Sequence, residues 1–450
     1  MTPSPSGPSG TELPPNKLPP TLRGEQGGPG PDDLGGALDA DAGPSARTLN
    51  VEVAEDRRAE AMHINMGPQH PSTHGVLRVV LELDGEDIIA ARPDIGFLHR
   101  GKEKVGEAFS YHKFIPYTDR LDYLAPLSNN VAYALAAEKL FGVECPPRAQ
   151  AIRVICHELS RISAHLLGLG AFAMDLGAMT VFLWTFRERE TIYSLIEHIC
   201  GARFTTSYTR IGGVERDLPD AFWTHLQSFV KEMPRRVDEY EGMLSRNRIW
   251  VERTRNVGVI TKEQCLQFGL TGPVLRGSGI EHDLRKSNPY LGYENYEFDI
   301  PIGTEGDCYD RYLVRIEEMR QSVRIMDQVL QTIPDGPIIN HEGDEVLKTV
   351  LPDKTKVLTN MEALIHQFMV GTEMSSAPAS GEVYLGSENP KGELGFYLRS
   401  DGSHEAARLR IRGPSFANLQ ILEEVLPGHM VADAMAILGS IDFVMGECDR

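Results

Sequence analysis

The sequence has few cysteines, and none of them are closely paired. Its 450 residues include six cysteines, and no two are spaced as Cys-x-x-Cys. So few cysteines in so long a chain exclude a disulfide-built scaffold and indicate a reducing compartment. Zinc or iron–sulfur sites made by this chain alone are not expected either. The length is ample for a sizeable hydrophobic core.

Excess positive charge and the common catalytic motifs are also missing. The chain has 45 Lys and Arg against 64 Asp and Glu, a net charge of −19. This balance argues against nucleic acid as a partner, because binding phosphates requires a basic face. No P-loop, G-x-S-x-G, H-E-x-x-H or strand–glycine loop–helix unit occurs. The sequence therefore offers no nucleotide fold or hydrolase site.

The longest apolar run approaches the length of a membrane span. Residues 166–184 are almost entirely apolar, but they include three glycines and Asp175. A lone carboxylate is costly in lipid, so we expect this run to be buried within protein. An aspartate in such surroundings needs a partner or a function.

The chain divides by composition into four parts. Residues 1–46 are rich in proline and glycine and are predicted to be a disordered tail. Residues 47–98 carry strand signals, including a predicted hairpin over 76–91. Residues 99–375 carry helical periodicity, and residues 376–450 return to strands followed by short helices. The prediction is an α+β fold with a large central helix bundle between two β regions.

Two apolar seams support the bundle. One runs from Ile152 to Leu169 on a long helix that should begin after Pro146 and Pro147. The other runs from Tyr309 to Leu330. Long helices with apolar seams are expected to pack against one another.

Three polar segments are candidate sites. Residues 66–75 contain His70 and His74 among prolines and glycines, which could hold a loop in one pose. Residues 94–104 and 117–123 contain charges of both signs. Each segment is also explained as a turn, a solvated helix start or a structural ion-pair cluster. Composition and spacing alone name no reaction.

The order of several motifs carries a family resemblance. From about residue 60 to 450 the chain resembles the D subunits of respiratory complex I, the proton-translocating NADH–quinone oxidoreductase. The motifs lie at residues 67–78, 122–124, 157–161, 186–190, 210–214, 270–273, 392–395 and 414–416. The family is related to the large subunit of nickel–iron hydrogenases, so the resemblance implies a hydrogenase-large-subunit-like fold.

The metal-binding cysteines of those hydrogenases have no counterpart here. Their two Cys-x-x-Cys pairs would fall at Asp122 and Ala125, and at Val444 and Glu447. Thiolates bind such soft metals, so no metal is expected in this chain. In the family, the emptied cavity has become the site of the quinone headgroup.

The resemblance implies roles for four residues. His74 and Tyr123 would donate hydrogen bonds and protons to the quinone, and Asp175 would pair with His74. Arg120 would lie beside the terminal iron–sulfur cluster of a neighbouring subunit. The family usually has a proline where this chain has Asp119, which could partly offset the charge of Arg120. Thr205 replaces a common histidine and Phe443 a common proline.

The resemblance also implies partners and a location. The quinone is the substrate, whereas NAD and the iron–sulfur clusters belong to other subunits. The expected neighbours are the subunit with the terminal cluster, the C subunit and the membrane-embedded quinone-channel subunit. The chain should be peripheral to the cell membrane on its cytoplasmic side, or on the matrix side in a mitochondrion, and inactive in isolation.

Three alternatives to this function remain open. They are a hydrogenase-type metal enzyme, a scaffold without chemistry, and a quinone-reducing complex with another electron donor. The absent cysteines argue against the first, and the joint presence of His74, Tyr123 and Asp175 argues against the second.

Overall fold

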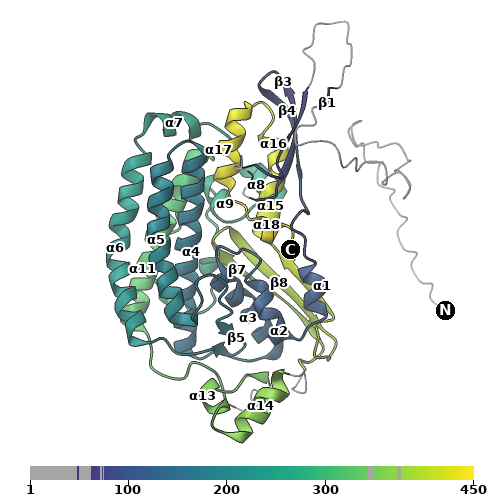
Figure 1. The fold of residues 1–450 in the computed structure, drawn as a ribbon, viewed down its shortest axis with the longest axis vertical. Helices are drawn as coiled ribbons and strands as arrows, with labels where there is room; N and C mark the ends of the chain where they lie inside the picture. The colour runs from purple at the N-terminus through teal and green to yellow at the C-terminus, as the bar shows by residue number, and fades with distance from the viewer. Residues whose placement is uncertain (1–47, 50–61, 71–72, 74, 343–348, 372–376) are drawn as a thin grey trace, which may run out of the picture. The chain divides into compact units, whose positions relative to one another are not determined.

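The computed structural model describes residues 48–49, 62–70, 73, 75–342, 349–371 and 377–450. The predicted tail, residues 1–46, lies outside these ranges. The described chain runs from a small antiparallel sheet through a set of long helices to a second antiparallel sheet and short helices (Figure 1). The predicted α+β class and the order of its three folded regions are confirmed, whereas the boundaries at 46, 98 and 375 stay predictions.

The N-terminal sheet has the strand order β1-β2-β3-β4, all antiparallel. Its strands are β1 (Thr48–Leu49), β2 (Met62–Met66), β3 (Arg78–Asp84) and β4 (Asp87–Asp94). Alternate residues of β3 are buried, namely Val79, Leu81 and Leu83, as expected for a strand with one face on the core. The predicted hairpin is the β3–β4 pair.

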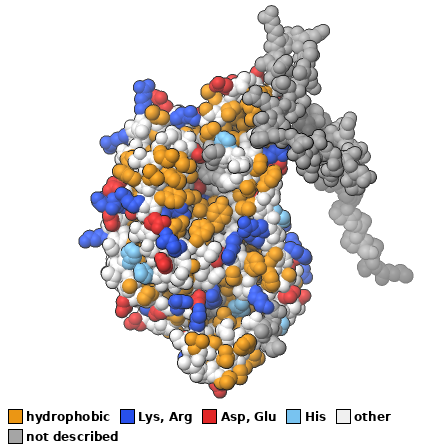
Figure 2. All heavy atoms as spheres, viewed as in Figure 1, with side chains coloured by type: hydrophobic (Ala, Val, Ile, Leu, Met, Phe, Trp, Pro, Cys, Tyr) orange, Lys and Arg blue, Asp and Glu red, His pale blue; other side chains and the backbone are white. Residues whose placement is uncertain are grey.

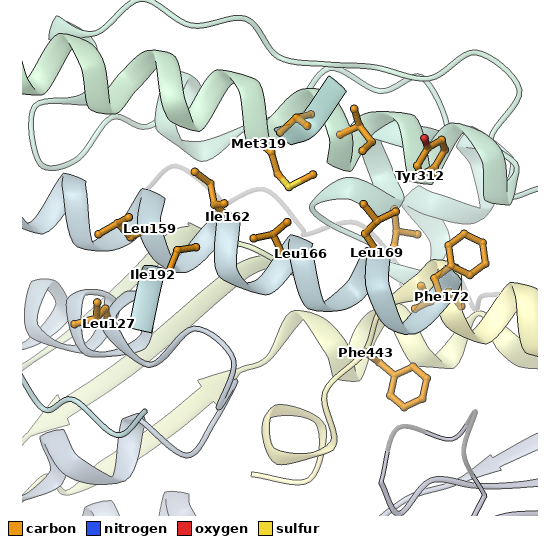
Figure 3. Close-up of a cluster of buried hydrophobic side chains, with 14 of the residues drawn as sticks. Leu127, Leu159, Ile162, Leu166, Leu169, Phe172, Ile192, Tyr312, Met319 and Phe443 are labelled. Atoms are coloured by element: carbon orange, nitrogen blue, oxygen red, sulfur yellow. The ribbon is translucent and has the colours of Figure 1, made fainter. Parts of the chain in front are cut away.

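Four long helices lie side by side in Figure 1: α4 (Pro147–Asp175), α5 (Met179–Cys200), α6 (Asp220–Leu244) and α11 (Cys308–Thr332). α4 begins at Pro147, one residue before the predicted start after Pro146 and Pro147, and this proline occupies the first helical position, where its missing N–H is tolerated. Figure 3 shows Leu159, Ile162, Leu166, Leu169 and Phe172 projecting along α4, with Met319 and Tyr312 of α11 opposite. Both predicted seams therefore form the core of the bundle.

The apolar run 166–184 is not one helix. α4 ends at Asp175 and α5 begins at Met179, with Gly177 at φ +90° between them. The expectation of burial holds for Leu166 and Leu169 but is wrong for Met179 and Leu183, which are more than half exposed. The glycine turns the chain, and at the start of α5 Met179 and Thr180 are exposed whereas Val181 is buried. Within the described residues, no helix is both long and apolar enough to cross a membrane.

The C-terminal sheet packs against α3 (Pro126–Phe141). Its strands pair antiparallel in the order β7 (Gly381–Asn389), β8 (Gly392–Ser400) and β9 (Arg408–Arg412). Short helices follow: α15 (Pro414–Gln420), α16 (Leu422–Val425), α17 (Val431–Ile441) and α18 (Met445–Cys448). Of these, α17 packs on α4 and α11, which brings the end of the chain back to the bundle.

Shorter elements connect these layers. They are α1 (Lys102–Glu107), α2 (Tyr111–Thr118), β5 (Thr209–Arg210), β6 (Gly213–Val214), α7 (Arg248–Thr254), α8 (Lys262–Phe268), α9 (Pro273–Gly277), α10 (Leu284–Ser287), η4 (Tyr293–Asn295), α13 (Lys354–Val357) and α14 (Met361–Gly371).

Candidate functional site

Segment 120–125, just before α3, and segment 444–447, at the start of α18, are far apart in the sequence but in contact in the structure. The ammonium of Lys102 donates a hydrogen bond to the carbonyl of Gly446 at 2.8 Å and another to the carbonyl of Arg120. A Cβ added to Gly446 would lie 2.6 Å from the carbonyl oxygen of Leu121 and 3.1 Å from Cδ1 of Tyr123. Only glycine allows this close approach. The segments 120–125 and 444–447 are therefore packed directly on each other.

The four positions that the sequence resemblance matched to hydrogenase cysteines lie at this junction. Ala125 and Val444 belong to one buried apolar cluster, against which Tyr123 packs. Asp122 and Glu447 are both fully buried, and the charge of Asp122 acts on Glu447. In the described parts of the chain, no three His, Cys, Asp or Glu side chains form a group that could hold a metal ion.

Tyr123 is a half-buried phenol in this junction. Leu167 and Ala164 of α4 belong to the same apolar cluster. Burial raises the pKa of Tyr123, and the negative charge of the neighbouring Asp122 raises it further. The hydroxyl therefore keeps its proton at neutral pH and is available as a hydrogen-bond donor.

Each of the two buried carboxylates has one anchored oxygen and one without a partner. Oδ1 of Asp122 accepts from the amide of Leu124 at 3.0 Å. Oε2 of Glu447 accepts from the hydroxyl of Ser415 at 2.5 Å and from its amide at 3.2 Å. Among the described residues, neither Oδ2 of Asp122 nor Oε1 of Glu447 has a hydrogen-bond partner.

Buried cations surround these carboxylates. The ammonium of Lys391, from the β7–β8 turn, pairs with Asp442. Nε of Arg315 lies 3.8 Å from the same carboxylate. Burial, helped by the positive charge of Arg100, lowers the pKa of Lys102 to about 8. No pattern in the sequence indicates that Lys102, Lys391 and Asp442 belong to this site, because they lie far apart along the chain.

Arg120 lies at the exposed edge of the junction. Its guanidinium donates to the carbonyl of Pro116 and lies 3.7 Å from Oδ2 of Asp119. Asp119 is buried and accepts from the side-chain amide of Asn130 at 2.7 Å and the hydroxyl of Ser207 at 2.9 Å. Burial raises the pKa of Asp119. The carboxylate of Asp119 is therefore close enough to the guanidinium to offset part of the charge of Arg120.

Asp175 is placed by the same helix that lines the site. It is the last residue of α4 and is partly buried. At about 1.5 Å of rise per residue, it lies about 12 Å beyond Leu167 along the helix axis. His74 lies outside the described residues, so its predicted pairing with Asp175 stays a prediction.

The loop next to His74 is held by local contacts. Thr73 is buried, and its hydroxyl donates to the carbonyl of His70 at 2.8 Å. Gly67 has φ +91°, and a Cβ there would lie 2.0 Å from the carbonyl oxygen of Leu77. These contacts fit the expectation that glycine holds the loop in one pose.

A second buried charge cluster holds α4, α9 and α11 together. Nε2 of His165 lies 2.7 Å from Glu318, which also pairs with Arg276 at 2.7 Å. Arg276 reaches Glu388 of β7 at 2.8 Å. Glu158 pairs with Arg161 at 3.1 Å. Glu158, Arg161 and His165 recur at three- and four-residue spacing, which indicates one polar face of α4, but the partners of this face on other elements were not predictable from the sequence.

Comparison with known proteins identifies the family. Residues 175–450, more than half of the chain, match the model of the family described as "Respiratory-chain NADH dehydrogenase, 49 Kd subunit". The D subunit of the NADH-quinone oxidoreductase of Methylacidiphilum infernorum is 61% identical over 399 residues, covering 89% of this chain and 94% of the relative. The protein of the same name from Akkermansia muciniphila is 59% identical over 391 residues, covering 87% and 93%.

A more distant relative has the same name. The D subunit of Trichlorobacter lovleyi is 52% identical over 391 residues, which cover 87% of this chain and 99% of the relative. The chain therefore belongs to the 49 kDa subunit family of the respiratory NADH dehydrogenase, complex I, and its partners are other subunits of that oxidoreductase complex.

Proposed function

We propose that this chain forms the quinone headgroup site of complex I and that Tyr123 and His74 donate hydrogen bonds and protons to the two quinone oxygens. The observation that carries this proposal is the half-buried phenol of Tyr123 at the junction of segments 120–125 and 444–447. Reducing a quinone places negative charge on its oxygens, and donors already aimed there stabilise that charge. The raised pKa of Tyr123 keeps its proton in place until a stronger base forms nearby.

Asp175 acts on the quinone through His74 in this proposal. A carboxylate beside an imidazole orients the ring and stabilises its charged form. When His74 gives up its proton, Asp175 loses part of its compensating charge. This change is the electrostatic signal that we propose for proton translocation in other subunits. The position of Asp175 at the end of α4, which also lines the Tyr123 cluster, supports the role.

We assign the exposed side of the site to the subunit with the terminal iron–sulfur cluster. Arg120 is 43% exposed there, and a fixed cation favours the reduced state of a nearby cluster. Large apolar side chains are also exposed, which is typical of a surface covered by a partner: Phe97, Phe109, Tyr117, Met179, Leu183 and Phe204. Figure 2 shows groups of hydrophobic side chains among basic ones on one face.

The remaining neighbours follow from the substrate. A lipid-soluble quinone must reach the site from the membrane, so the membrane-embedded quinone-channel subunit adjoins it, and the C subunit completes the peripheral arm. The chain is then peripheral to the cell membrane on its cytoplasmic side, or on the matrix side in a mitochondrion. Electrons come from NADH through partner clusters, so the isolated chain is inactive. A hydrogenase-type centre is not proposed, because the junction has no thiolate pair to bind its metal.

Replacing Tyr123 by Phe tests the proposal. The change removes the hydroxyl and keeps the ring that packs on Gly446. We expect the NADH–quinone activity of membranes to fall by about 100-fold, as for loss of a positioned proton donor. NADH–ferricyanide activity, which draws electrons upstream, should be unchanged, and a native gel should show the assembled complex.

A matched control is Tyr397→Phe. The hydroxyl of Tyr397 on β8 donates to Glu382 of the neighbouring strand, at 2.7 Å. This variant should keep full quinone activity. An assembled Tyr123→Phe complex that reduces quinone as fast as this control would refute the proposed site.

A further inference from the structure

We propose that, within the quinone site proposed above and resting on it, Asp122 and Glu447 hold one proton between them and return it to Tyr123 after the tyrosine has protonated the reduced quinone. Neither carboxylate is assigned to touch the quinone. Both act through Tyr123.

Both carboxylates belong to residues that lie next to Tyr123. Asp122 is its neighbour in the chain, and Glu447 follows Gly446, on which the ring of Tyr123 packs. Both side chains are fully buried. Each is fixed through one oxygen, by the Leu124 amide or by Ser415, while its second oxygen is buried without a hydrogen-bond partner among the described residues.

A shared proton explains the two unpartnered oxygens. A buried carboxylate oxygen without a donor is unfavourable, and two ionised carboxylates in one site repel each other. One proton held by the pair removes a charge and supplies a donor. Burial and the charge of Asp122 raise the pKa of Glu447 to about 7, and burial also raises the pKa of Asp122. The pair titrates as a unit.

The surrounding charges allow the Asp122–Glu447 pair to hold a proton and also to release it. Lys391 favours ionisation of both carboxylates, whereas Asp442 opposes ionisation of Asp122. Arg189 of α5 also acts on Asp122, and Glu447 interacts with Lys102. The Cys448 thiol, whose pKa burial raises to about 12, stays neutral. Because Lys391 is already paired with Asp442, it cannot fully neutralise two more carboxylates.

The proton transfer balances in two steps. The O–H bond of Tyr123 breaks as an O–H bond forms on the quinone oxygen, which has received electrons from the partner's iron–sulfur cluster. The phenolate then takes the proton from the Asp122–Glu447 pair, which is left with both carboxylates ionised. The pair regains a proton from solvent before the next turnover.

The test is the pH profile of NADH–quinone activity at saturating quinone in the assembled complex, with Glu447→Gln as the variant. The pair is protonated below its pKa, so the unmodified complex should lose activity as the pH rises through about 7. The Glu447→Gln variant leaves Asp122 with no second carboxylate and so removes the shared proton. Its activity should be about 10-fold lower on the acid side, should change little across neutrality, and should meet that of the unmodified complex on the alkaline side.

A second variant and a control complete the test. Asp122→Asn keeps the oxygen that accepts from the Leu124 amide but removes the charge that helps to raise the pKa of Glu447, so its alkaline loss of activity should begin at a lower pH. Glu263→Gln, exposed in the first turn of α8, should keep the unmodified profile. The KM for quinone should not change in any of the three, because neither carboxylate binds the substrate.

Three results would overturn the proposal that Asp122 and Glu447 hold a proton for Tyr123, which is called the proton reserve below. They are an unmodified complex without an alkaline loss of activity, an assembled Glu447→Gln complex with the unmodified profile, and an assembled Asp122→Asn complex with that profile. Failure of the quinone site itself is distinguishable. It would appear as full activity in Tyr123→Phe, whereas failure of the reserve alone would leave Tyr123→Phe inactive.

Discussion

Lys102 holds the two halves of the candidate site together, because its ammonium donates to the carbonyl of Gly446 at 2.8 Å. The same ammonium donates to the carbonyl of Arg120, next to the residues that carry the site. Lys102 is almost fully buried, so these carbonyls have little access to water in its absence. Segments 120–125 and 444–447 thus depend on one side chain from α1.

Replacing Lys102 by Met should therefore loosen the site. Leaving the buried carbonyl of Gly446 without a donor costs about 1–3 kcal/mol, and the partly buried carbonyl of Arg120 adds less. We expect faster thermal loss of quinone activity in the assembled complex. Lys104→Met is the matched control, since Lys104 lies on the same helix and is 86% exposed. Equal inactivation rates for the two variants would contradict the assigned role of Lys102.

Gly446→Ala should disturb the site from the other side. The added methyl would lie 2.6 Å from the carbonyl oxygen of Leu121, so one of the two segments must shift. We expect a higher KM for quinone and a lower kcat, with NADH–ferricyanide activity unchanged. Gly242→Ala in α6 is the control, because nothing lies within 4 Å of its added Cβ. Unaltered quinone kinetics in Gly446→Ala would argue against the packing of Tyr123 on this glycine.

Asp175→Asn should slow quinone reduction and leave the complex assembled. The amide keeps the size of the side chain at the end of α4 but removes the charge proposed to stabilise protonated His74. We expect a decrease of about 10-fold or more in NADH–quinone activity, measured beside a native gel. Turnover equal to that of the unmodified complex would refute the pairing.

Low pH should lower the stability of the helix bundle by protonating Glu318. Its positive neighbour Arg276 and the bond to His165 lower the pKa of Glu318 to about 2 against burial, which acts in the opposite direction. A lowered carboxylate pKa stabilises the fold above the unfolded value, and this stability is lost as the pH falls toward 2. Burial lowers the pKa of His165, so acid opposes its burial too.

Glu318→Gln tests this assignment by thermal inactivation of the complex at neutral and acid pH. It should destabilise by about 3 kcal/mol at neutral pH, because Arg276 loses a buried partner. It should also show a smaller further loss in acid. Glu252→Gln breaks only an exposed pair with Arg248 and should change stability by less than about 1 kcal/mol. An unchanged acid response in Glu318→Gln would contradict the assignment.

The sequence could predict the elements that depend on local pattern. The α4 seam has helical spacing, and the β3–β4 hairpin has a glycine turn at Gly85 between apolar runs. The sequence pattern singled out Asp175 in its apolar run and the segment 117–123, but the roles of Asp175 and Tyr123 at a quinone site came only from the family resemblance. The few residues on either side of Tyr123 and of Asp175 in the sequence do not specify a functional site.

The sequence could not predict contacts between distant segments. Lys102, Ser415 and Lys391 reach the junction from three separate elements, and no spacing links them. The expected burial of Met179 and Leu183 failed for a related reason. Apolar composition indicates that a side chain is buried away from water, but it does not say whether it is buried by its own chain or by a partner subunit.

Labelling with a photoreactive quinone analogue tests the central claim most directly. The assembled complex is irradiated with the analogue, digested and analysed by mass spectrometry, with excess unlabelled quinone as competitor. The account predicts competed labelling in this chain within segments 120–125 or 444–447, which surround Tyr123. Competed labelling that is confined to other subunits, or to parts of this chain other than these two segments and His74, would contradict it.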